Sequence, residues 1–300
     1  MTPLRLGTRG SPLALTQAHM VRDALLAVHG WEKEAVEIVV VTTTGDVVQD
    51  RPLAEIGGKA LWTKELDRAL DGGMIDFAVH SMKDVETIRP AEIAIAAMLP
   101  RADVRDRLIG ADSVDALGEG ARVGTSSPRR AAQLRRLRPD LRIVMFRGNV
   151  DTRLAKLAAG EADATLLAAA GLDRLARPDI GSAIPLETML PAPAQGAVGI
   201  ECLAARDDLR ALLAAIGDAR TERCVMAERA FLLALGADCH SPVAALATIE
   251  GDRLRLRGEI LSEDGSLHVV GTAEDEWPGA TLAADLLANA PAPLRALFAP

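Results

Sequence analysis

The chain has 300 residues, of which 49% are hydrophobic and 25% are charged, which excludes a disordered protein and suits two or three folded domains. A formal net charge of −8 and an aromatic content of 2% argue against general nucleic-acid binding, which relies on basic surfaces and aromatic stacking. Three widely spaced cysteines and five scattered histidines predict neither a disulfide framework nor a protein-built metal site.

The first ten residues lack the basic start and the apolar run of a secretory signal. No apolar run approaches the ~20 residues that a membrane span requires. We therefore expect a cytoplasmic protein without membrane or nucleic-acid partners.

Short apolar runs alternate with amphipathic stretches up to about residue 200. Ser11 and Pro12 predict the start of the first helix and Gly30 its end, since these residue types favour helix caps. The predicted strands are 4–7, 37–42, 75–80, 93–97, 122–124, 142–146, 164–168 and 198–201. The predicted helices are 12–30, 61–70, 128–137 and 150–159, with a long loop at 45–58.

The pattern changes after about residue 217, where a helix at 221–235 precedes strands at 244–249, 254–261 and 267–274 and a helix at 280–287. We therefore predict an α/β protein with two α/β domains of mixed sheets and a small α+β C-terminal domain. The predicted domains are 1–99 with 197–217, then 100–196, then 218–300. The two α/β halves could be a structural duplication, although their sequences show no clear repeat.

His80-Ser81-Met82-Lys83-Asp84 lies where the strand 75–80 ends, and ligands bind at the carboxyl ends of strands in such sheets. Lys83 favours the charged form of the neighbouring Asp84 carboxyl group. The alternative is a solvated loop without a function.

Gly-Thr-Ser-Ser-Pro-Arg-Arg at 124–130 follows a strand and opens a helix, which suits an anion site built from backbone N–H groups, hydroxyls and guanidiniums. An ordinary capped helix with exposed arginines is the alternative. Further cations follow other strands or a glycine pair, at Arg9, Lys59, Arg147 and Arg153. Each alone is typical of a surface charge, but the set indicates a local anion site in an acidic protein.

Cys239 lies in a polar loop at 236–242, a position that raises the chance of thiol reactivity. Cys202 and Cys224 fall in a predicted strand and a predicted helix, so both are expected in the core.

In this order, the segments resemble the hydroxymethylbilane synthase family, also called the porphobilinogen deaminase family. The resemblance covers residue 4 to about 245, with a looser fit to the end. It rests on an ordered series of short motifs, at 5–14, 57–59, 64–66, 80–84, 124–130, 147–150, 152–154, 170–175, 195–201 and the Cys239 loop.

The resemblance implies a monomer of three domains, two of them similar to periplasmic binding proteins. It implies that Cys239 carries a covalent dipyrromethane cofactor through a thioether and that Asp84 is the catalytic carboxylate. The implied reaction joins four porphobilinogen units head to tail through oligopyrrole intermediates, with release of ammonia, for tetrapyrrole biosynthesis.

Each porphobilinogen carries an acetate and a propionate, so a growing chain requires guanidinium forks and helix N-termini. The residues that the resemblance assigns to cofactor and substrate binding are Arg9, Ser11, Lys59, Ser81, Lys83, Thr125, Ser127, Arg129, Arg130, Arg147, Arg153, Arg174 and Gln195.

Several positions depart from the family pattern, and those in the loop put its cationic contacts in doubt. They are Thr44, Glu55, Trp62, Pro128 and Asp238. Two other classes of protein share some of these features. A non-catalytic two-domain protein that binds small anions would share the cations, and a cysteine hydrolase would use Cys239 with a histidine.

Overall fold

The structure is a computed structural model that describes residues 2–42 and 63–298. The chain forms two compact units, and the backbone passes between them three times. Unit 1 comprises Met1–Ala102 and Ala197–Glu222, and unit 2 comprises Asp103–Gly196 and Arg223–Pro300.

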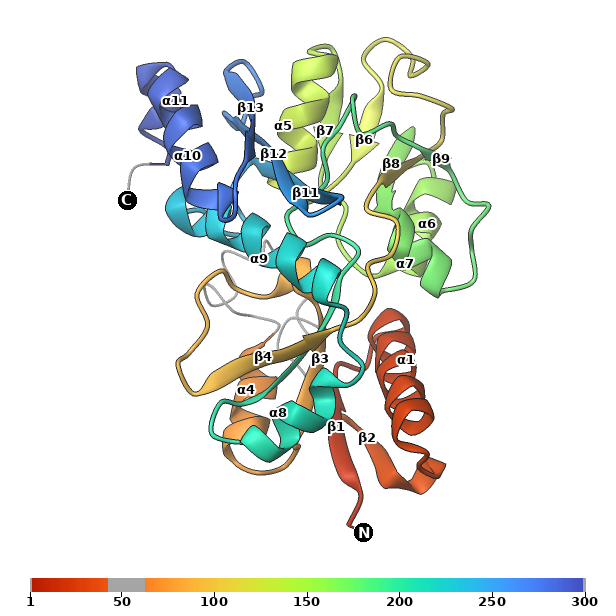
Figure 1. Cartoon of the computed structure of the whole chain (residues 1–300). Coiled ribbons are helices and arrows are strands. Elements are labelled where there is room, and N and C mark those ends of the chain that lie inside the picture. The colour runs from red at the N-terminus through yellow and green to blue at the C-terminus, as the bar shows by residue number, and fades with distance from the viewer. Residues whose placement is uncertain (1, 43–62, 299–300) are drawn as a thin grey trace. The chain divides into compact units, whose positions relative to one another are not determined.

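Unit 1 is built on a five-stranded sheet in the order β2-β1-β3-β10-β4 (Figure 1). The strands are β1 (Leu4–Thr8), β2 (Val36–Val40), β3 (Phe77–Ser81), β4 (Ile93–Met98) and β10 (Val198–Leu203). β1 runs parallel to β2 and β3, whereas β10 runs antiparallel to β3 and β4. The expected return of the strand at 198–201 to the first sheet is therefore confirmed.

Helices α1 (Pro12–His29), α4 (Lys64–Asp71) and α8 (Asp207–Ala214) pack on this sheet, and a short 3-10 helix, η1 (Lys33–Ala35), precedes β2. The predicted caps of α1 are confirmed: Ser11 Oγ accepts a hydrogen bond from the Ala14 amide, and Gly30 ends the helix at a φ of 65°. Ala18, Val21 and Leu25 form its buried face.

Unit 2 contains a second five-stranded sheet in the order β7-β6-β8-β5-β9. Its strands are β5 (Asp106–Ile109), β6 (Arg122–Gly124), β7 (Arg142–Val144), β8 (Ala164–Ala168) and β9 (Ser182–Ala183). Its helices are α5 (Pro128–Leu137), α6 (Val150–Ala158) and α7 (Ala169–Arg174).

Both sheets place a strand between two parallel neighbours and then add one antiparallel strand and an edge strand. In each sheet the antiparallel strand, β10 or β5, enters just after the chain has left the other unit. This shared topology favours the suggested duplication of the two halves.

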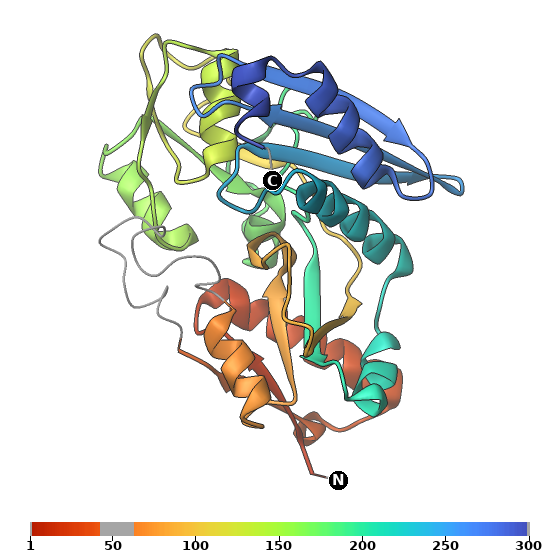
Figure 2. The ribbon, with the colours of Figure 1, turned by 90° about the vertical axis from the view of Figure 1, so that its left-hand side faces the viewer.

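The same unit includes a three-stranded antiparallel sheet of β11 (Val243–Glu250), β12 (Arg253–Leu261) and β13 (His268–Glu274). Helix α10 (Pro278–Asn289) lies across one face of this sheet (Figure 2), and α9 (Ala219–Ala234) and α11 (Ala292–Arg295) complete the fold. Phe231, Leu256 and Leu282 lie in its apolar core. The predicted fold class is confirmed, and the three-domain boundaries stay a prediction.

The sequence analysis missed β5, β9, α7, α8 and α11, which are short. β5 also begins with two charged residues, Asp106 and Arg107, which hide the strand because Asp106 is buried against arginines instead of facing water. The predicted loop at 45–58 and the start of the helix predicted at 61–70 lie outside the described residues. None of the helices within 2–42 and 63–298 is long and apolar enough to cross a bilayer.

Gly199 on β10 provides a test of how tightly the sheet packs against Met82, in the 3-10 helix η2 (Met82–Asp84). A Cβ atom at Gly199 would lie 2.0 Å from Met82 Sδ, and Met82 is buried. We expect Gly199→Ala to lower the free energy of unfolding by about 1–3 kcal/mol, because the core must shift to accept the methyl group. Urea unfolding measures this. Gly118→Ala, whose Cβ would meet nothing within 4 Å, is the control, and an equal effect of both changes would contradict the prediction.

Candidate active site and anion-binding corner

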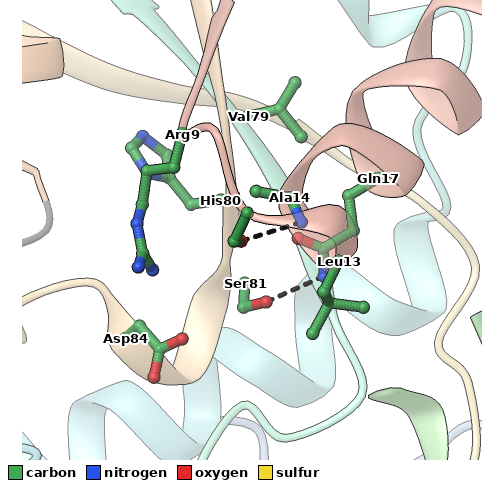
Figure 3. Close-up of a pocket in the computed structure, with 9 residues that line it drawn as sticks. Arg9, Leu13, Ala14, Gln17, Val79, His80, Ser81 and Asp84 are labelled. Atoms are coloured by element: carbon green, nitrogen blue, oxygen red, sulfur yellow. Dashed lines mark hydrogen bonds between the residues drawn. The ribbon is translucent and has the colours of Figure 1, made fainter. Parts of the chain in front are cut away.

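A pocket in unit 1 lies at the carboxyl ends of β1 and β3 (Figure 3). The pairing of Gly7 with Ala78 sets the two parallel strands side by side, so the segments that follow them meet. Arg9 and Ser11 come from the first segment, and Asp84 lies in η2 after the second. The residues lining the pocket are Arg9, Ser11, Leu13, Ala14, Gln17, Val79, His80, Ser81 and Asp84.

Two hydrogen bonds fix the walls of this pocket. Ser11 Oγ caps α1, and Gln17 Nε2 on the same helix donates to Ser81 Oγ at 2.8 Å. Figure 3 shows the Arg9 guanidinium and the Asp84 carboxylate pointing toward the same part of the pocket. The pocket therefore presents a carboxylate and a cation together on a rigid frame.

The structure brings four predicted site residues of unit 1 together, Arg9, Ser11, Ser81 and Asp84. Lys83 lies in η2, next to Asp84 in the chain, and is half-buried. The predicted Lys59 and the departures at Thr44, Glu55 and Trp62 lie outside the described residues.

The sequence analysis missed Gln17, and it did not assign His80 a role although it named the segment. Gln17 is a buried polar residue within the apolar face of α1. Such a residue on an otherwise apolar face is the signal that could have identified it.

In unit 2, the segment 124–130 forms the predicted corner between β6 and α5. Ser127 is the N-cap of α5 and accepts from the Arg130 amide, while its own amide donates to Thr125 Oγ1 at 3.1 Å. Pro128 occupies the first helical position, so this departure from the family pattern is compatible with the helix start.

Arg129 and Arg130 are buried, so the alternative of exposed arginines is wrong. Both guanidiniums pair with the carboxylate of Asp106 on β5, at 2.7 and 2.6 Å. Burial alone would raise the pKa of Asp106, but the two guanidiniums outweigh it and hold this pKa well below its usual range. The sequence analysis missed Asp106 because its partners lie in a different element.

The remaining predicted residues of unit 2 differ in how fully they are paired. Arg174 Nη2 donates to the Gly196 carbonyl and Arg153 Nε to the Gly148 carbonyl. Gln195 Nε2 donates to the Val104 carbonyl and to the Asp106 carboxylate.

Within the described residues, the buried nitrogens without a hydrogen-bond partner include Arg147 Nη1 and Arg174 Nε, and also the Nε atoms of Arg129 and Arg130. Burial also lowers the pKa of the Arg174 guanidinium. Buried cationic N–H groups that lack an acceptor are costly, and Arg147 and Arg174, unlike Arg129 and Arg130, form no ion pair with a carboxylate among the described residues. Their nitrogens therefore fit the carboxylates of a ligand.

Cys239 is exposed, whereas Cys202 and Cys224 are buried as predicted. It lies in a turn beyond α9, which ends near Gly236 at a φ of 62°. Asp238 closes this turn, because its Oδ1 accepts from the His240 amide and its amide donates to Ser241 Oγ. The departure at Asp238 therefore supports the turn that presents the thiol.

Three features define the class of protein: a carboxylate in a pocket at strand ends, buried guanidinium nitrogens without acceptors, and an exposed thiol. Together they indicate an α/β enzyme that handles anionic ligands. Among the described residues, no group of three or more His, Cys, Asp or Glu side chains could hold a metal ion.

Family models identify the chain more closely. Residues 4–211 match "Porphobilinogen deaminase, dipyromethane cofactor binding domain", and residues 222–288 match "Porphobilinogen deaminase, C-terminal domain". The porphobilinogen deaminase of Sphingopyxis alaskensis is 61% identical over 99% of this chain and 97% of its own length. That of Paracoccus denitrificans is 53% identical over 97% of this chain and 95% of its own length. The chain belongs to the porphobilinogen deaminase family, and the resemblance predicted from its motifs is confirmed.

Solved structures of periplasmic binding proteins show a distant likeness. A periplasmic substrate-binding protein of an ABC transporter from Coxiella burnetii gives a TM-score of 0.44 at 15% identity, over 73% of this chain and 94% of its own. A ligand-binding component of an ABC-type import system from Staphylococcus aureus gives 0.41 at 11% identity, over 77% and 73%.

The Asp106 pairing predicts a large and pH-dependent contribution to stability. Asp106→Asn leaves two buried guanidiniums without their carboxylate, so we expect a loss of about 3–5 kcal/mol at neutral pH. Because the folded-state pKa of Asp106 is depressed, its stabilisation is present above the unfolded pKa of about 3.9 and is lost as the pH falls below it.

Urea unfolding of the unchanged protein and of Asp106→Asn, from pH 7 to pH 3, measures the difference between their unfolding free energies. Asp163→Asn is the control, since Asp163 pairs with Arg122 at the surface. A difference for Asp106→Asn that is as small as that control, or that grows as the pH falls below 4, would contradict the prediction.

Proposed function

We propose that this protein is a hydroxymethylbilane synthase, a transferase that joins four porphobilinogen units head to tail and releases four ammonia molecules. The product, hydroxymethylbilane, serves tetrapyrrole biosynthesis, including that of porphyrins and heme. The observation that carries the proposal is the Asp84 carboxylate beside Arg9 in the unit 1 pocket, in a chain whose family match extends from residue 4 to 288.

The residues of unit 2 fit the dipyrromethane cofactor of this family. Cys239 offers an exposed sulfur for a thioether, since a thiolate can attack an electron-poor pyrrole methylene carbon. Arg147 and Arg174 offer buried N–H groups without acceptors to the cofactor carboxylates. When bound, this group supplies the pyrrole carbon that accepts the first substrate unit.

Asp84 acts on the charge that develops in the substrate. Departure of ammonia from porphobilinogen leaves an electron-poor azafulvene whose pyrrole N–H gains positive charge. A carboxylate held in the pocket stabilises that charge by a few kcal/mol, because it is already oriented when the charge appears. Arg9 points into the same pocket and suits an acetate or propionate group of the substrate.

The other predicted cations and hydroxyls divide into two groups. Arg129 and Arg130 pair with Asp106, so they contribute to ligand binding mainly by shaping the α5 corner with Thr125 and Ser127. The residues that we propose to contact cofactor or substrate directly are Arg9, Ser11, Lys59, Ser81, Lys83, Arg147, Arg153, Arg174 and Gln195.

We further infer that the protein is a cytoplasmic monomer of three domains, with the third domain at 218–300 and the two α/β domains at 1–99 with 197–217 and at 100–196. The family resemblance and the separate three-stranded sheet support this organisation. Light scattering of the purified protein measures its mass in solution and so tests the monomer.

Covalent attachment of the cofactor is tested by intact mass spectrometry. We expect the purified protein to be heavier than its sequence by one dipyrromethane, because the Cys239 sulfur forms a thioether. Cys239→Ser should lose this increment, whereas Cys224→Ser, which changes a buried thiol, should retain it.

A folded wild-type chain with the unmodified mass would overturn the attachment and favour a non-catalytic anion-binding protein. Alkylation of Cys239 by a small reagent distinguishes a cysteine hydrolase from the proposed synthase, since a free catalytic thiol reacts and a thioether sulfur does not.

Removal of the Asp84 charge should stop turnover without loss of cofactor. We expect Asp84→Asn to retain the mass increment and the unfolding free energy but to lower kcat with porphobilinogen about 10²–10³-fold, as for loss of one preorganised electrostatic group. Asp71→Asn, which changes an exposed carboxylate at the end of α4, should retain full activity. Near-normal turnover of Asp84→Asn would refute the electrostatic role.

A further inference from the structure

A buried cluster of charged residues in unit 1 contacts a residue that lines the active-site pocket. At its centre, Arg89 pairs with three carboxylates, those of Asp67, Glu86 and Glu201, at 2.6, 2.7 and 2.8 Å. Glu201 is fully buried on β10, and the Arg89 side chain is 8% exposed. Burial of these charges costs free energy, which is offset only while the guanidinium and the carboxylates keep their hydrogen-bonded geometry.

The pocket residue that this cluster contacts is His80. Its Nε2 lies 3.0 Å from Glu201 Oε2, and the His80 side chain is 5% exposed. The two residues come from adjacent antiparallel strands, since Glu201 pairs with Ala78 and Gly199 with His80. The contact therefore joins the charged cluster to the end of β3, from which Ser81 and Asp84 follow.

The charge of Glu201 decides which nitrogen of His80 carries a proton. Burial would raise the pKa of Glu201, but His80 and Arg89 outweigh this and hold it at about 2. The contact does not have hydrogen-bond geometry, so His80 Nε2 is a buried nitrogen without a hydrogen-bond partner in the structure. A carboxylate 3.0 Å away nevertheless attracts an N–H group and repels a ring lone pair, so we expect Nε2 to carry the hydrogen of the neutral ring, which leaves Nδ1 as an acceptor.

Arg89 in turn holds the Glu201 carboxylate in place. Its Nε donates to Oε1 at 2.8 Å and its Nη2 to Oε2 at 3.0 Å, a two-pronged contact that stops the carboxylate from rotating. Its Nη1 donates to Glu86 and its Nη2 to Asp67, so the guanidinium is itself anchored on both sides.

We propose that Glu201 and Arg89 are positioning residues for the reaction at the Asp84 pocket, because they fix the His80 ring with its proton on Nε2. The role rests on the proposed function, but the ring geometry can be measured without turnover. A fixed ring keeps one wall of the pocket, and the acceptor at Nδ1, constant while successive substrate units react.

Nitrogen-15 NMR of the histidine rings tests the geometry in the holoenzyme. The five histidines are told apart by the loss of one signal in His80→Asn, and Nε2 is recognised by its coupling to both ring C–H protons. We expect His80 to carry hydrogen on Nε2. A ring with hydrogen on Nδ1 alone would overturn the proposal, and this measurement requires no change at Glu201.

Glu201→Gln tests the consequence for catalysis. A side-chain amide can donate to His80, so we expect the proton to move to Nδ1. We expect kcat with porphobilinogen to fall about 10- to 100-fold, by analogy with the loss when the residue that orients a metal-bound histidine is removed. KM should change less, because His80 is held and not removed. Arg89→Gln, which frees the carboxylate to rotate, should broaden the His80 signals and lower kcat in the same direction.

Asp67→Asn is the matched control, because Asp67 pairs with the same guanidinium from α4. It should leave the His80 proton on Nε2 and leave kcat close to that of the unchanged protein, although it weakens the cluster. An equal fall in kcat for Asp67→Asn and Glu201→Gln at equal loss of unfolding free energy would show a purely structural role and overturn the proposal.

If the chain carries no dipyrromethane mass and forms no hydroxymethylbilane, the proposed function fails whatever the state of the ring. If the cofactor and turnover are present but His80 lacks hydrogen on Nε2, or Glu201→Gln turns over normally, the positioning role alone fails.

Discussion

Burial of guanidinium groups against carboxylates is the constraint on which both units depend. Arg89 in unit 1 and Arg129 with Arg130 in unit 2 lie in the interior, where an unpaired charge costs several kcal/mol, and each is matched by acidic residues of its own unit. These pairs fix the segments beside them. Glu201 contacts His80 near the end of β3, and Asp106 pairs with Arg130 in the first turn of α5. The fold thus uses its buried charges to hold the segments that carry the proposed ligand-binding side chains.

The shared topology of the two sheets gives each unit the same kind of corner. In unit 1 the first strand leads through Ser11 into α1, and in unit 2 β6 leads through Ser127 into α5. Each serine caps a helix that begins with proline, so each corner offers a helix N-terminus near the carboxyl end of a strand. The corners differ in their arginines: Arg9 points into a pocket, whereas Arg129 and Arg130 turn inward to Asp106.

Local signals in the sequence predicted the parts of the fold and site that depend on short-range physics. The Ser11 cap, the Gly30 end and the strands on either side of the helix at 128–137 follow from residue types and spacing alone, and the order of motifs indicated the family. Long-range pairing could not be predicted in the same way. Asp106 and Arg129 are 23 positions apart, and Glu201 lies far along the chain from His80, so no local pattern links them. The same limit hid the partner of Gln17, because Gln17 lies on α1 and Ser81 lies at the end of β3, 64 positions further along the chain.

The pairing of each cation also determines what it can do for an anionic ligand. A guanidinium whose N–H groups already bind a buried carboxylate gains little from a second acceptor, since its desolvation is already offset. Arg129 and Arg130 each keep a buried Nε–H group without a hydrogen-bond partner, but their terminal nitrogens pair with Asp106. Arg147 and Arg174 differ, because among the described residues neither forms an ion pair with a carboxylate and each also keeps a buried N–H group without an acceptor. A pyrrole chain that adds two carboxylates with every unit needs cations of this second kind. The division between arginines with and without a paired carboxylate therefore supports the proposal that Arg147 and Arg174 contact the ligand, and sequence alone cannot reveal it because all four residues are arginine.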